Sequence, residues 1–453
     1  MKQVRRGVFE TNSSSTHSIT ICPQETYEKW MNGQVLYSDW NDDFIEAEEL
    51  TPYDYEQAGT QYEAHKGKYY KGWNELSAEE QKEYTTEYVL RNKKKNDYDE
   101  YLTYSEWCYS HGDLEQYAEH YTTKNGDKIV AFGYYGYDGQ GGFMNLIGKY
   151  QNGNYTVSIF DDGTKIREND LDFFETEFPE SMDLKITNKC HNGCAFCHEN
   201  STCDGKHGDI MSPSFIDKLH PYTEIAIGGG NPLEHPDLVP FLEKLKTLKM
   251  IPSMTIRQND FMDNLELITE LVNKKLIYGL GISLVSTKQD GFIEAVQKFP
   301  NAVIHVINGI VTLDELEMLA YHNLKILILG YKEVRRGKDL FYSDLATQSW
   351  IMQLRKETYD MLPQIIGCRW FDVVSFDNLA IKQLNPQRLM SKEKWNEMYM
   401  GDDGIDGEMT SASMFIDMVE RQFAKNSCSM DRYPLMDNIT DMYNVLRGKN
   451  GVD

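Results

Sequence analysis

Three cysteines with short spacing are the residues in this chain best suited to chemistry. Cys190, Cys194 and Cys197 form the pattern C-x-x-x-C-x-x-C within CHNGCAFC. Such tight clustering favours metal binding over disulfides in an intracellular chain. Four thiolates would close a [4Fe–4S] cluster for plain electron transfer, whereas three leave one iron open. An open iron can chelate a small molecule through an amine and a carboxylate. Electron transfer into an adjacent sulfonium can then break a carbon–sulfur bond.

Two other kinds of metal site could use the same cysteines, and the sequence alone does not decide between them. A structural zinc site would add one of four neighbouring side chains: Cys203, His191, His198 or His207. Zinc sites more often pair two C-x-x-C knuckles across a longer loop, which fits this segment poorly. A closed ferredoxin-like cluster would take Cys203 as its fourth ligand.

The elements that must position these cysteines begin near residue 177. Six short apolar runs alternate with segments that are apolar at i, i+3 and i+4. The runs are MDLKIT (182–187), EIAIGG (224–229), SMTIRQ (253–258), GLGISLV (279–285), AVIHVI (302–307) and KILILG (325–330). This alternation predicts an α/β fold with a parallel sheet. Because six strands are too few for a closed eight-stranded barrel, we expect an open (β/α)6 partial TIM barrel. Its ligands would lie at the carboxyl ends of the strands.

The barrel divides the chain into three expected domains. Residues 1–175 form an N-terminal α+β domain with a role in substrate recognition or as a lid. Residues 176–335 form the core barrel, and residues 336–453 form a C-terminal extension. Further expected elements are helices at Ala78–Arg91, Tyr101–His120 and Leu345–Leu362, a hairpin in YTVSIFDDGTKIR, one or two strands in FDVVSFDNLAIKQL, and a helix or strand pair in MFIDMVERQFAK.

A glycine-rich segment follows the second apolar run. The sequence GGGNP places Gly228, Gly229 and Gly230 where backbone atoms can approach a ligand closely. Together with the cysteine spacing and the aromatic Phe196 before the last cysteine, it resembles the signature of the radical S-adenosylmethionine superfamily. GGGNP is similar to that superfamily's Gly-Gly-Glu-Pro motif, whose backbone holds the amino group of the cofactor. Asn231 here takes the place of the usual glutamate.

The resemblance, which extends over Met182 to Gly330, implies the remaining cofactor-binding residues. A polar side chain at the third strand end, Arg257 or Gln258, would meet the cofactor carboxylate, Ser283 the ribose, and Asn308 the neighbourhood of the adenine. The implied cofactor-binding set is Phe196, Gly228, Gly229, Gly230, Asn231, Pro232, Gln258, Ser283 and Asn308, with Cys190, Cys194 and Cys197 as the metal ligands. A more local resemblance, in FETNSSSTHS, CHENS and GGGNP, is to uncharacterised radical S-adenosylmethionine proteins of Firmicutes bacteria and their phages.

The activity implied by this resemblance is radical chemistry. The [4Fe–4S] cluster would cleave S-adenosylmethionine reductively to a 5′-deoxyadenosyl radical, which would abstract hydrogen from a small molecule or nucleotide. Two alternatives remain: modification of a peptide or protein recognised by the tyrosine-rich, acidic N-terminal region, and a non-enzymatic structural or sensing metal site. An external flavodoxin- or ferredoxin-like protein would supply the electron.

Polar residues near the cysteines supply candidate catalytic groups. His198 adjoins a ligand cysteine and could assist proton transfer. In YKEVRRGK, Lys332, Arg335 and Arg336 follow the sixth apolar run and could clamp a carboxylate or a phosphate.

Composition limits the partners of the protein. The formal net charge of −25 disfavours general nucleic-acid binding, because such a surface repels phosphate backbones. No apolar run approaches the roughly 18–20 residues that span a bilayer, and the N-terminus does not resemble a signal peptide. We therefore expect a cytoplasmic protein that does not bind membranes.

Overall fold

A computed structural model describes most of the chain and divides it into two compact units. The described residues are 2–10, 17–19, 22–38, 43–46, 52–65, 71–93, 102–105, 107, 115–122, 128–135, 145–171, 173–390, 392–400 and 412–448. The smaller unit is Ile21–Phe143, and the larger joins Met1–Thr20 to Met144–Asp453. The domain boundaries expected at residues 175 and 335 stay a prediction.

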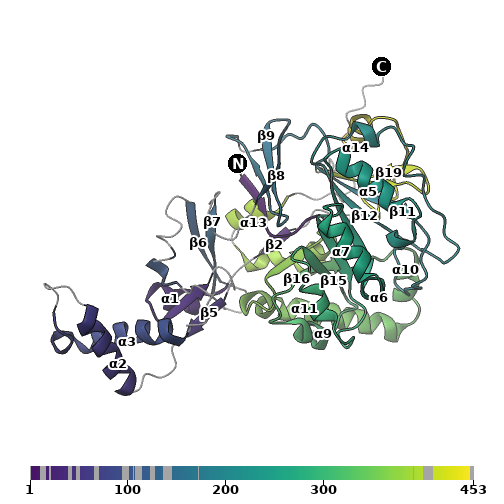
Figure 1. Cartoon of the computed structure of the whole chain (residues 1–453). Coiled ribbons are helices and arrows are strands. Elements are labelled where there is room, and N and C mark those ends of the chain that lie inside the picture. The colour runs from purple at the N-terminus through teal and green to yellow at the C-terminus, as the bar shows by residue number, and fades with distance from the viewer. Residues whose placement is uncertain are drawn as a thin grey trace. The chain divides into compact units, whose positions relative to one another are not determined.

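The smaller unit combines two small antiparallel sheets with helices (Figure 1). Its aromatic core surrounds Trp30, which is completely buried against Tyr27, Tyr37 and Trp107. The expected helix at Ala78–Arg91 is confirmed. The one at Tyr101–His120 is wrong in its last part, since residues 115–122 pair as a strand with residues 128–135, whereas Tyr104, Ser105 and Trp107 are helical. The elements are β3 (Cys22–Pro23), α1 (Gln24–Met31), β4 (Val35–Ser38), β5 (Asp43–Glu46), α2 (Pro52–His65), η1 (Trp73–Glu75), α3 (Ala78–Lys93), β6 (Glu115–Thr122) and β7 (Lys128–Tyr135).

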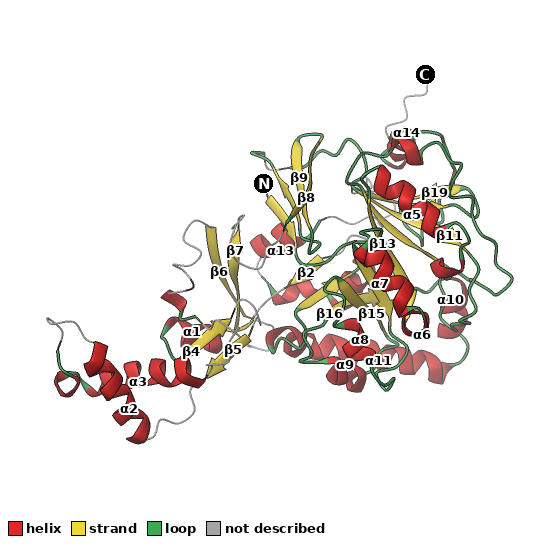
Figure 2. Ribbon diagram, in the orientation of Figure 1, coloured by secondary structure: helices red, strands yellow, loops and turns green. Residues whose placement is uncertain are grey.

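A large, mainly parallel sheet forms the centre of the larger unit (Figure 2). All six expected strands are present and lie side by side in sequence order, each parallel to the next. Most of their residues are buried, as expected of a parallel sheet covered on both faces. These strands are β11 (Ser181–Thr187), β12 (Glu224–Gly229), β13 (Ile251–Arg257), β14 (Gly279–Ser283), β15 (Ala302–Asn308) and β16 (Lys325–Gly330).

Helices alternate with these strands along the chain. In Figure 1, α5, α6 and α7 lie beside the strands that they connect. Each strand-to-strand connection contains a helix or a 3₁₀ turn, which is how neighbouring parallel strands are joined. The elements are η2 (Ile216–Lys218), η3 (Pro232–Glu234), α5 (Leu238–Thr247), α6 (Gln258–Asp263), α7 (Leu265–Asn273), α8 (Phe292–Val296), α9 (Leu313–Leu319), α10 (Arg335–Phe341) and α11 (Leu345–Gly367).

The C-terminal part extends the sheet at both edges. β17 pairs in parallel with β16, and β18 pairs in parallel with β11. Beyond them, β2 pairs antiparallel with β17, and β19 and β20 continue antiparallel from β18. The elements are β2 (His17–Ile19), β17 (Val373–Phe376), α12 (Asn378–Leu384), η4 (Pro386–Leu389), α13 (Lys392–Met398), β18 (Ser413–Asp417), β19 (Gln422–Ala424), β20 (Tyr433–Pro434) and α14 (Ile439–Leu446).

A second sheet and the N-terminal segment lie at the amino ends of the parallel strands. The sheet has the order β1–β10–β9–β8, and its β9–β10 hairpin is the one expected in YTVSIFDDGTKIR. Val8 and Phe9 are buried, and Lys325, the first residue of β16, donates to the carbonyl of Gly7 at 2.6 Å. The strands are β1 (Lys2–Arg5), β8 (Leu146–Asn152), β9 (Tyr155–Phe160) and β10 (Lys165–Glu168). Residues 11–16, the centre of FETNSSSTHS, lie outside the described residues.

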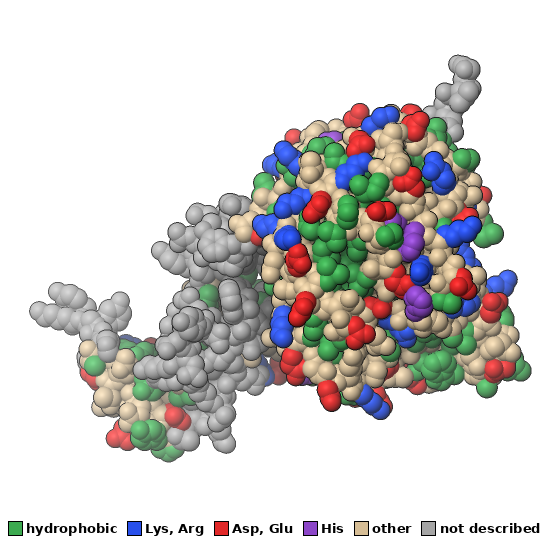
Figure 3. All heavy atoms as spheres, turned by 45° about the vertical axis from the view of Figure 1, so that its right-hand side comes forward, with side chains coloured by type: hydrophobic (Ala, Val, Ile, Leu, Met, Phe, Trp, Pro, Cys, Tyr) green, Lys and Arg blue, Asp and Glu red, His purple; other side chains and the backbone are tan. Residues whose placement is uncertain are grey.

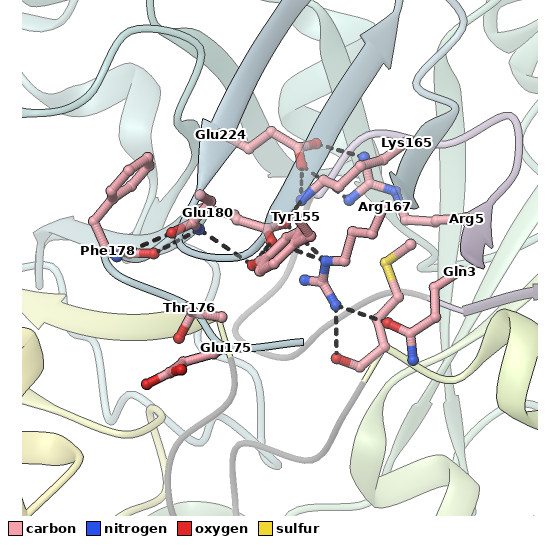
Figure 4. A network of polar contacts seen from close by, with 12 residues as sticks. Gln3, Arg5, Tyr155, Lys165, Arg167, Glu175, Thr176, Phe178, Glu180 and Glu224 are labelled. Atoms are coloured by element: carbon pink, nitrogen blue, oxygen red, sulfur yellow. Dashed lines mark hydrogen bonds and ion pairs between the residues drawn. The ribbon is translucent and has the colours of Figure 1, made fainter. Parts of the chain in front are cut away.

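Buried charges join this second sheet to the amino ends of β11 and β12 (Figure 4). Glu224, the first residue of β12, forms ion pairs of 2.6 Å with both Arg5 and Lys165. Glu180, just before β11, pairs with Arg167 at 2.9 Å and with Lys165 at 3.2 Å. Burial opposes the charge of Glu224, but Arg5 and Lys165 outweigh it and hold the pKa of this carboxyl near 2.

The outer surface of the larger unit carries both charge signs. Acidic and basic side chains are interspersed over the face shown in Figure 3. In the described part of the chain, no helix is both long and apolar enough to cross a membrane.

Candidate functional site

A cavity of about 350 Å³ opens at the carboxyl ends of the parallel strands. Strands β11 to β16 and β18 all contribute to its wall, and so do the loops that follow β11 and β12. The predicted site residues that line it are Cys190, Cys194, Phe196, Cys197, His198, Gly228, Gly229, Gly230, Asn231 and Ser283. Residues drawn from distant parts of the sequence therefore meet at the end of the sheet where parallel α/β folds bind ligands.

Backbone hydrogen bonds fix the loop that carries the cysteines. The amide of Cys190 donates to the carbonyl of Thr202 at 2.8 Å, and Asn188 donates to Lys206 at 2.8 Å. The loop therefore folds back on itself directly after β11. Cys190, Cys194 and Cys197 are free, half-buried thiols.

Arg257 at the end of β13 and Asp260 in α6 hold Asn192, two residues after Cys190, in place. Arg257 Nη1 donates to the backbone and side-chain oxygens of Asn192 at 2.9 and 3.1 Å. Asn192 Nδ2 lies 2.7 Å from Asp260 Oδ2 and 3.5 Å from Cys190 Sγ. Burial raises the pKa of the Cys194 thiol, and the charge of Arg257 opposes that rise. A cation at this position favours thiolates in the cavity.

The glycine segment approaches the cysteine loop more closely than other residues could. The amide of Gly230 donates to the carbonyl of Thr187 at 2.6 Å, and Asn231 donates to Lys189 at 2.8 Å. A β-carbon on Gly230 would lie 2.1 Å from the Lys189 oxygen. Gly229 has φ +113°, and a β-carbon there would lie 2.4 Å from the Thr187 oxygen. Gly228 differs, because a β-carbon there would meet no atom within 4 Å and would project into the cavity.

These residues fit an iron–sulfur cluster with a small ligand beside it. In the described ranges, no three His, Cys, Asp or Glu side chains converge as closely as a single metal ion requires. A four-iron cluster makes a different demand, because each thiolate binds a separate iron. Three thiols around one cavity meet that demand, and the open space at Gly228 leaves backbone beside them exposed to a ligand.

An ion-pair network supports the residues directly after Cys197. Glu199 Oε2 lies 2.9 Å from Lys185 Nζ and 3.4 Å from Arg335 Nη1, and Lys185 also pairs with Asp417 of β18 at 3.0 Å. Burial opposes the charge of Glu199, but its cationic neighbours hold its pKa near 2. Although 35% of the His198 side chain is exposed, burial of the ring and the charge of Lys332 lower its pKa. Glu199, whose Oε1 lies 3.3 Å from His198 Nε2, opposes that shift.

The basic residues after β16 separate into different environments. Lys332 lines the cavity and donates to Ser427 Oγ at 3.2 Å. Arg335 donates to the carbonyl of His198 at 2.7 Å, and Arg336 donates to the carbonyl of Ser201 at 2.5 Å. Two of the three cations thus hold the cysteine loop against α10, whereas Lys332 faces the cavity.

Three predicted cofactor residues lie outside the cavity lining. Gln258 is completely buried, and its Oε1 accepts from the amides of Val285 and Ser286 at 2.7 and 3.0 Å. Asn308 is buried and donates to Gln383 Oε1 at 3.0 Å. Pro232 begins η3 and is buried. Their cofactor roles stay predictions, and the residue of the β13 end that lines the cavity is Arg257.

The structure adds cavity residues that the sequence did not single out. Asn192 and Asp260 are hydrogen-bonded to each other, and Lys185 and Asp183 come from β11. His305 lies in β15, and burial lowers its pKa to about 3. The one available signal was a polar residue inside an otherwise apolar strand, as in AVIHVI and MDLKIT.

Comparison with known proteins agrees with this geometry. Residues 184–317 match the family model described as the Radical SAM superfamily. The matched segment contains the three cysteines, the glycine segment and strands β12 to β15.

Several solved structures are similar to the larger part of the chain. SuiB of Streptococcus suis bound to precursor peptide SuiA matches with a TM-score of 0.40 and 14% identity over 60% of this chain and 66% of that chain. SuiB bound to S-adenosylmethionine gives 0.39 and 14%, over 60% and 68%. The protein anSMEcpe with bound AdoMet gives 0.39 and 13%, over 60% and 80%. The match thus spans about two thirds of SuiB. No curated protein matches the sequence.

Proposed function

We propose that this chain is a radical S-adenosylmethionine enzyme that acts on a small molecule or nucleotide. The observation that carries the proposal is the shared cavity: Cys190, Cys194 and Cys197 line it together with the Gly228–Asn231 backbone. The family match over residues 184–317 supports it. We propose further that β11 to β16 form an open partial barrel, which β17 and β18 extend.

Cys190, Cys194 and Cys197 would hold a [4Fe–4S] cluster, and the backbone of residues 228–231 would contact the amino group of S-adenosylmethionine. When bound, the cluster and cofactor supply a 5′-deoxyadenosyl radical that abstracts hydrogen from the substrate, after one electron enters from a flavodoxin- or ferredoxin-like donor. A cytoplasmic location fits this need for a reducing environment.

The chain's own residues position these groups and exclude water. Arg257 and Asp260 fix Asn192, which contacts Cys190. Apolar side chains of the strands and loops, among them Phe196 and Phe415, contribute to the cavity wall. A dry wall protects a reactive intermediate from side reactions with solvent. His198 is placed to accept or donate a proton beside the third cysteine.

The decisive test is anaerobic reconstitution with iron and sulfide, followed by dithionite and S-adenosylmethionine. We expect about four irons per chain and formation of 5′-deoxyadenosine, measured by chromatography. Protein that binds this iron and never forms 5′-deoxyadenosine would refute the proposal and favour the non-enzymatic site.

A matched pair of cysteine variants tests the ligand assignment. Cys194→Ala should reduce 5′-deoxyadenosine formation below detection, because it removes one of three thiolates. Cys203→Ala removes an exposed free thiol of the same loop and should behave like the parent. Loss of the cluster in Cys203→Ala would instead support the closed four-cysteine site.

A further inference from the structure

A second cavity of about 310 Å³ adjoins the first and has a different character. Its lining consists of charged and carboxamide side chains, with no apolar residue among those that define it. Lys185 and Glu199 line both cavities, so the two meet at this ion pair. A cavity of this size and polarity suits a small polar group better than an apolar one.

Arg432 lies on the boundary between the two cavities. Its guanidinium stacks over the ring of Phe415 at 4.7 Å, and Phe415 lines the first cavity while Arg432 lines the second. Its Nε donates to the carbonyl of Ser429 at 3.0 Å, and Nη2 donates to that of Ser427 at 2.6 Å. These contacts fix the orientation of the guanidinium.

The partners of Arg432 leave it able to bind an anion. In the described part of the chain, both of its hydrogen-bonded partners are neutral carbonyls, and no carboxylate lies within ion-pair distance. One end of the guanidinium fork, Nη1, keeps its two donors available. A planar guanidinium with free donors is the side chain best suited to carboxylate or phosphate recognition.

The other charges of the second cavity are mostly paired. Lys185 lies between Glu199 and Asp417, at 2.9 and 3.0 Å. Arg335, whose side chain is 40% exposed, contacts Glu199 at 3.4 Å and adds a second guanidinium to the wall. Glu420 is the remaining acid of the lining, and it is exposed to solvent. Among these lining residues, three cations face three carboxylates, and Arg432 is the cation with no carboxylate within ion-pair distance.

We propose that Arg432, assisted by Arg335, binds an oxyanion group of the substrate, a carboxylate or a phosphate, in this second cavity. The proposal rests on the proposed function, because it anchors a substrate whose reactive part lies in the first cavity. The Phe415–Arg432 contact joins the two cavities and sets where that anion lies relative to the radical site.

The test is anion binding by the full chain, measured as the rise in unfolding temperature with inorganic phosphate or acetate at constant ionic strength. Sodium chloride is the reference. We expect a saturable rise with one of the two anions, and the preferred anion identifies phosphate or carboxylate as the group recognised. The absence of any rise beyond chloride would overturn the proposal.

Substitutions locate the binding at Arg432. Arg432→Gln should weaken the apparent affinity about tenfold, because the charge-assisted hydrogen bonds are lost. Arg432→Lys keeps the charge but not the fork and should fall between Arg432→Gln and the parent. Arg421→Gln removes one positive charge from an exposed residue near the same strands and should bind like the parent. Equal binding by Arg432→Gln and the parent would place the anion elsewhere and refute the site.

The two proposals fail in different ways. Anion binding needs neither cluster nor cofactor, so it can be measured on protein that never forms 5′-deoxyadenosine. If phosphate or acetate binds through Arg432 in such protein, the radical assignment fails and the anion site stands. If 5′-deoxyadenosine forms and no anion binds, the radical assignment stands and the anion site fails.

Discussion

The two ends of the parallel strands use the same kinds of charged residues for different purposes. At the amino ends, Arg5, Lys165 and Arg167 are buried against Glu180 and Glu224 and bonded to them at 2.6 to 3.2 Å. At the carboxyl ends, charged residues line two cavities, and Arg432 keeps donors toward one of them. Buried, paired charges fix strand positions at the amino ends, whereas at the carboxyl ends paired charges surround the cavities and Arg432 keeps donors available for a ligand.

The largest loss of stability should come from disrupting the buried ion pairs at the amino ends of the parallel strands. Glu224→Gln removes the common partner of Arg5 and Lys165 and leaves two buried cations poorly compensated. We expect a loss of about 3–5 kcal/mol in the free energy of unfolding, measured by denaturant titration. Iron content after reconstitution should be unchanged in the folded protein.

Glu266→Gln is the matched control for this substitution. Glu266 is exposed on α7, so its replacement should change stability by about 0.5 kcal/mol at most. If the two variants unfold at the same denaturant concentration, the buried ion pairs of Glu224 do not stabilise the fold.

Lowering the pH should reduce the free energy of unfolding through the same ion pairs, gradually and by a smaller amount. The pKa of Glu224 is near 2 in the folded chain and 4.5 in its ordinary state. A carboxyl with a lowered folded pKa contributes its full stability above the ordinary value, and loses it as the pH falls toward the folded value. The parent should therefore lose stability from about pH 4.5 downward, and Glu224→Gln should lose less. Parallel stability curves for the two proteins between pH ~6 and ~3.5 would contradict this.

Local sequence patterns predicted the centre of the molecule well. Each apolar run from 182 to 330 became a strand of the sheet in sequence order, because burial on both faces requires such runs. Parallel strands then bring their carboxyl ends together, so the loop after β11 and the glycines at the end of β12 had to meet. The long helix expected at Leu345–Leu362 is also present, as Leu345–Gly367.

Strand pairings between segments far apart in the sequence could not be predicted in the same way. β18 pairs with β11 across more than 200 residues, and no local signal specifies that register. MFIDMVERQFAK left helix and strand pair open, and its pairing as β18 and β19 selects the strands. FDVVSFDNLAIKQL was expected to form one or two strands, and it forms one, β17, followed by the helix α12. Asp377 caps the following helix α12 by accepting from the amide of Ala380 at 2.6 Å, a cap signal that was available in the sequence.

At the carboxyl ends of the strands, Gly229 and Gly228 should have different roles: Gly229 in the stability of the fold and Gly228 in ligand binding. Gly229→Ala would place a β-carbon 2.4 Å from the Thr187 oxygen on a backbone with φ +113°. We expect a loss of about 1–3 kcal/mol in unfolding free energy, because both the clash and the backbone conformation oppose alanine. Denaturant titration of the variant checks this. Stability equal to the parent would show that the segment after β12 can shift away from β11.

The smallest effect on stability should come from the adjacent residue. Gly228→Ala adds a methyl group that meets no protein atom within 4 Å, so unfolding free energy should change by about 0.5 kcal/mol at most. The methyl group would occupy space in the cavity beside the cysteines, so we expect S-adenosylmethionine to bind the reconstituted variant about tenfold more weakly, measured by calorimetry. Unchanged affinity in Gly228→Ala would mean that the cofactor does not contact this backbone. Gly229→Ala should thus lower the stability of the fold, whereas Gly228→Ala should lower the affinity for the ligand.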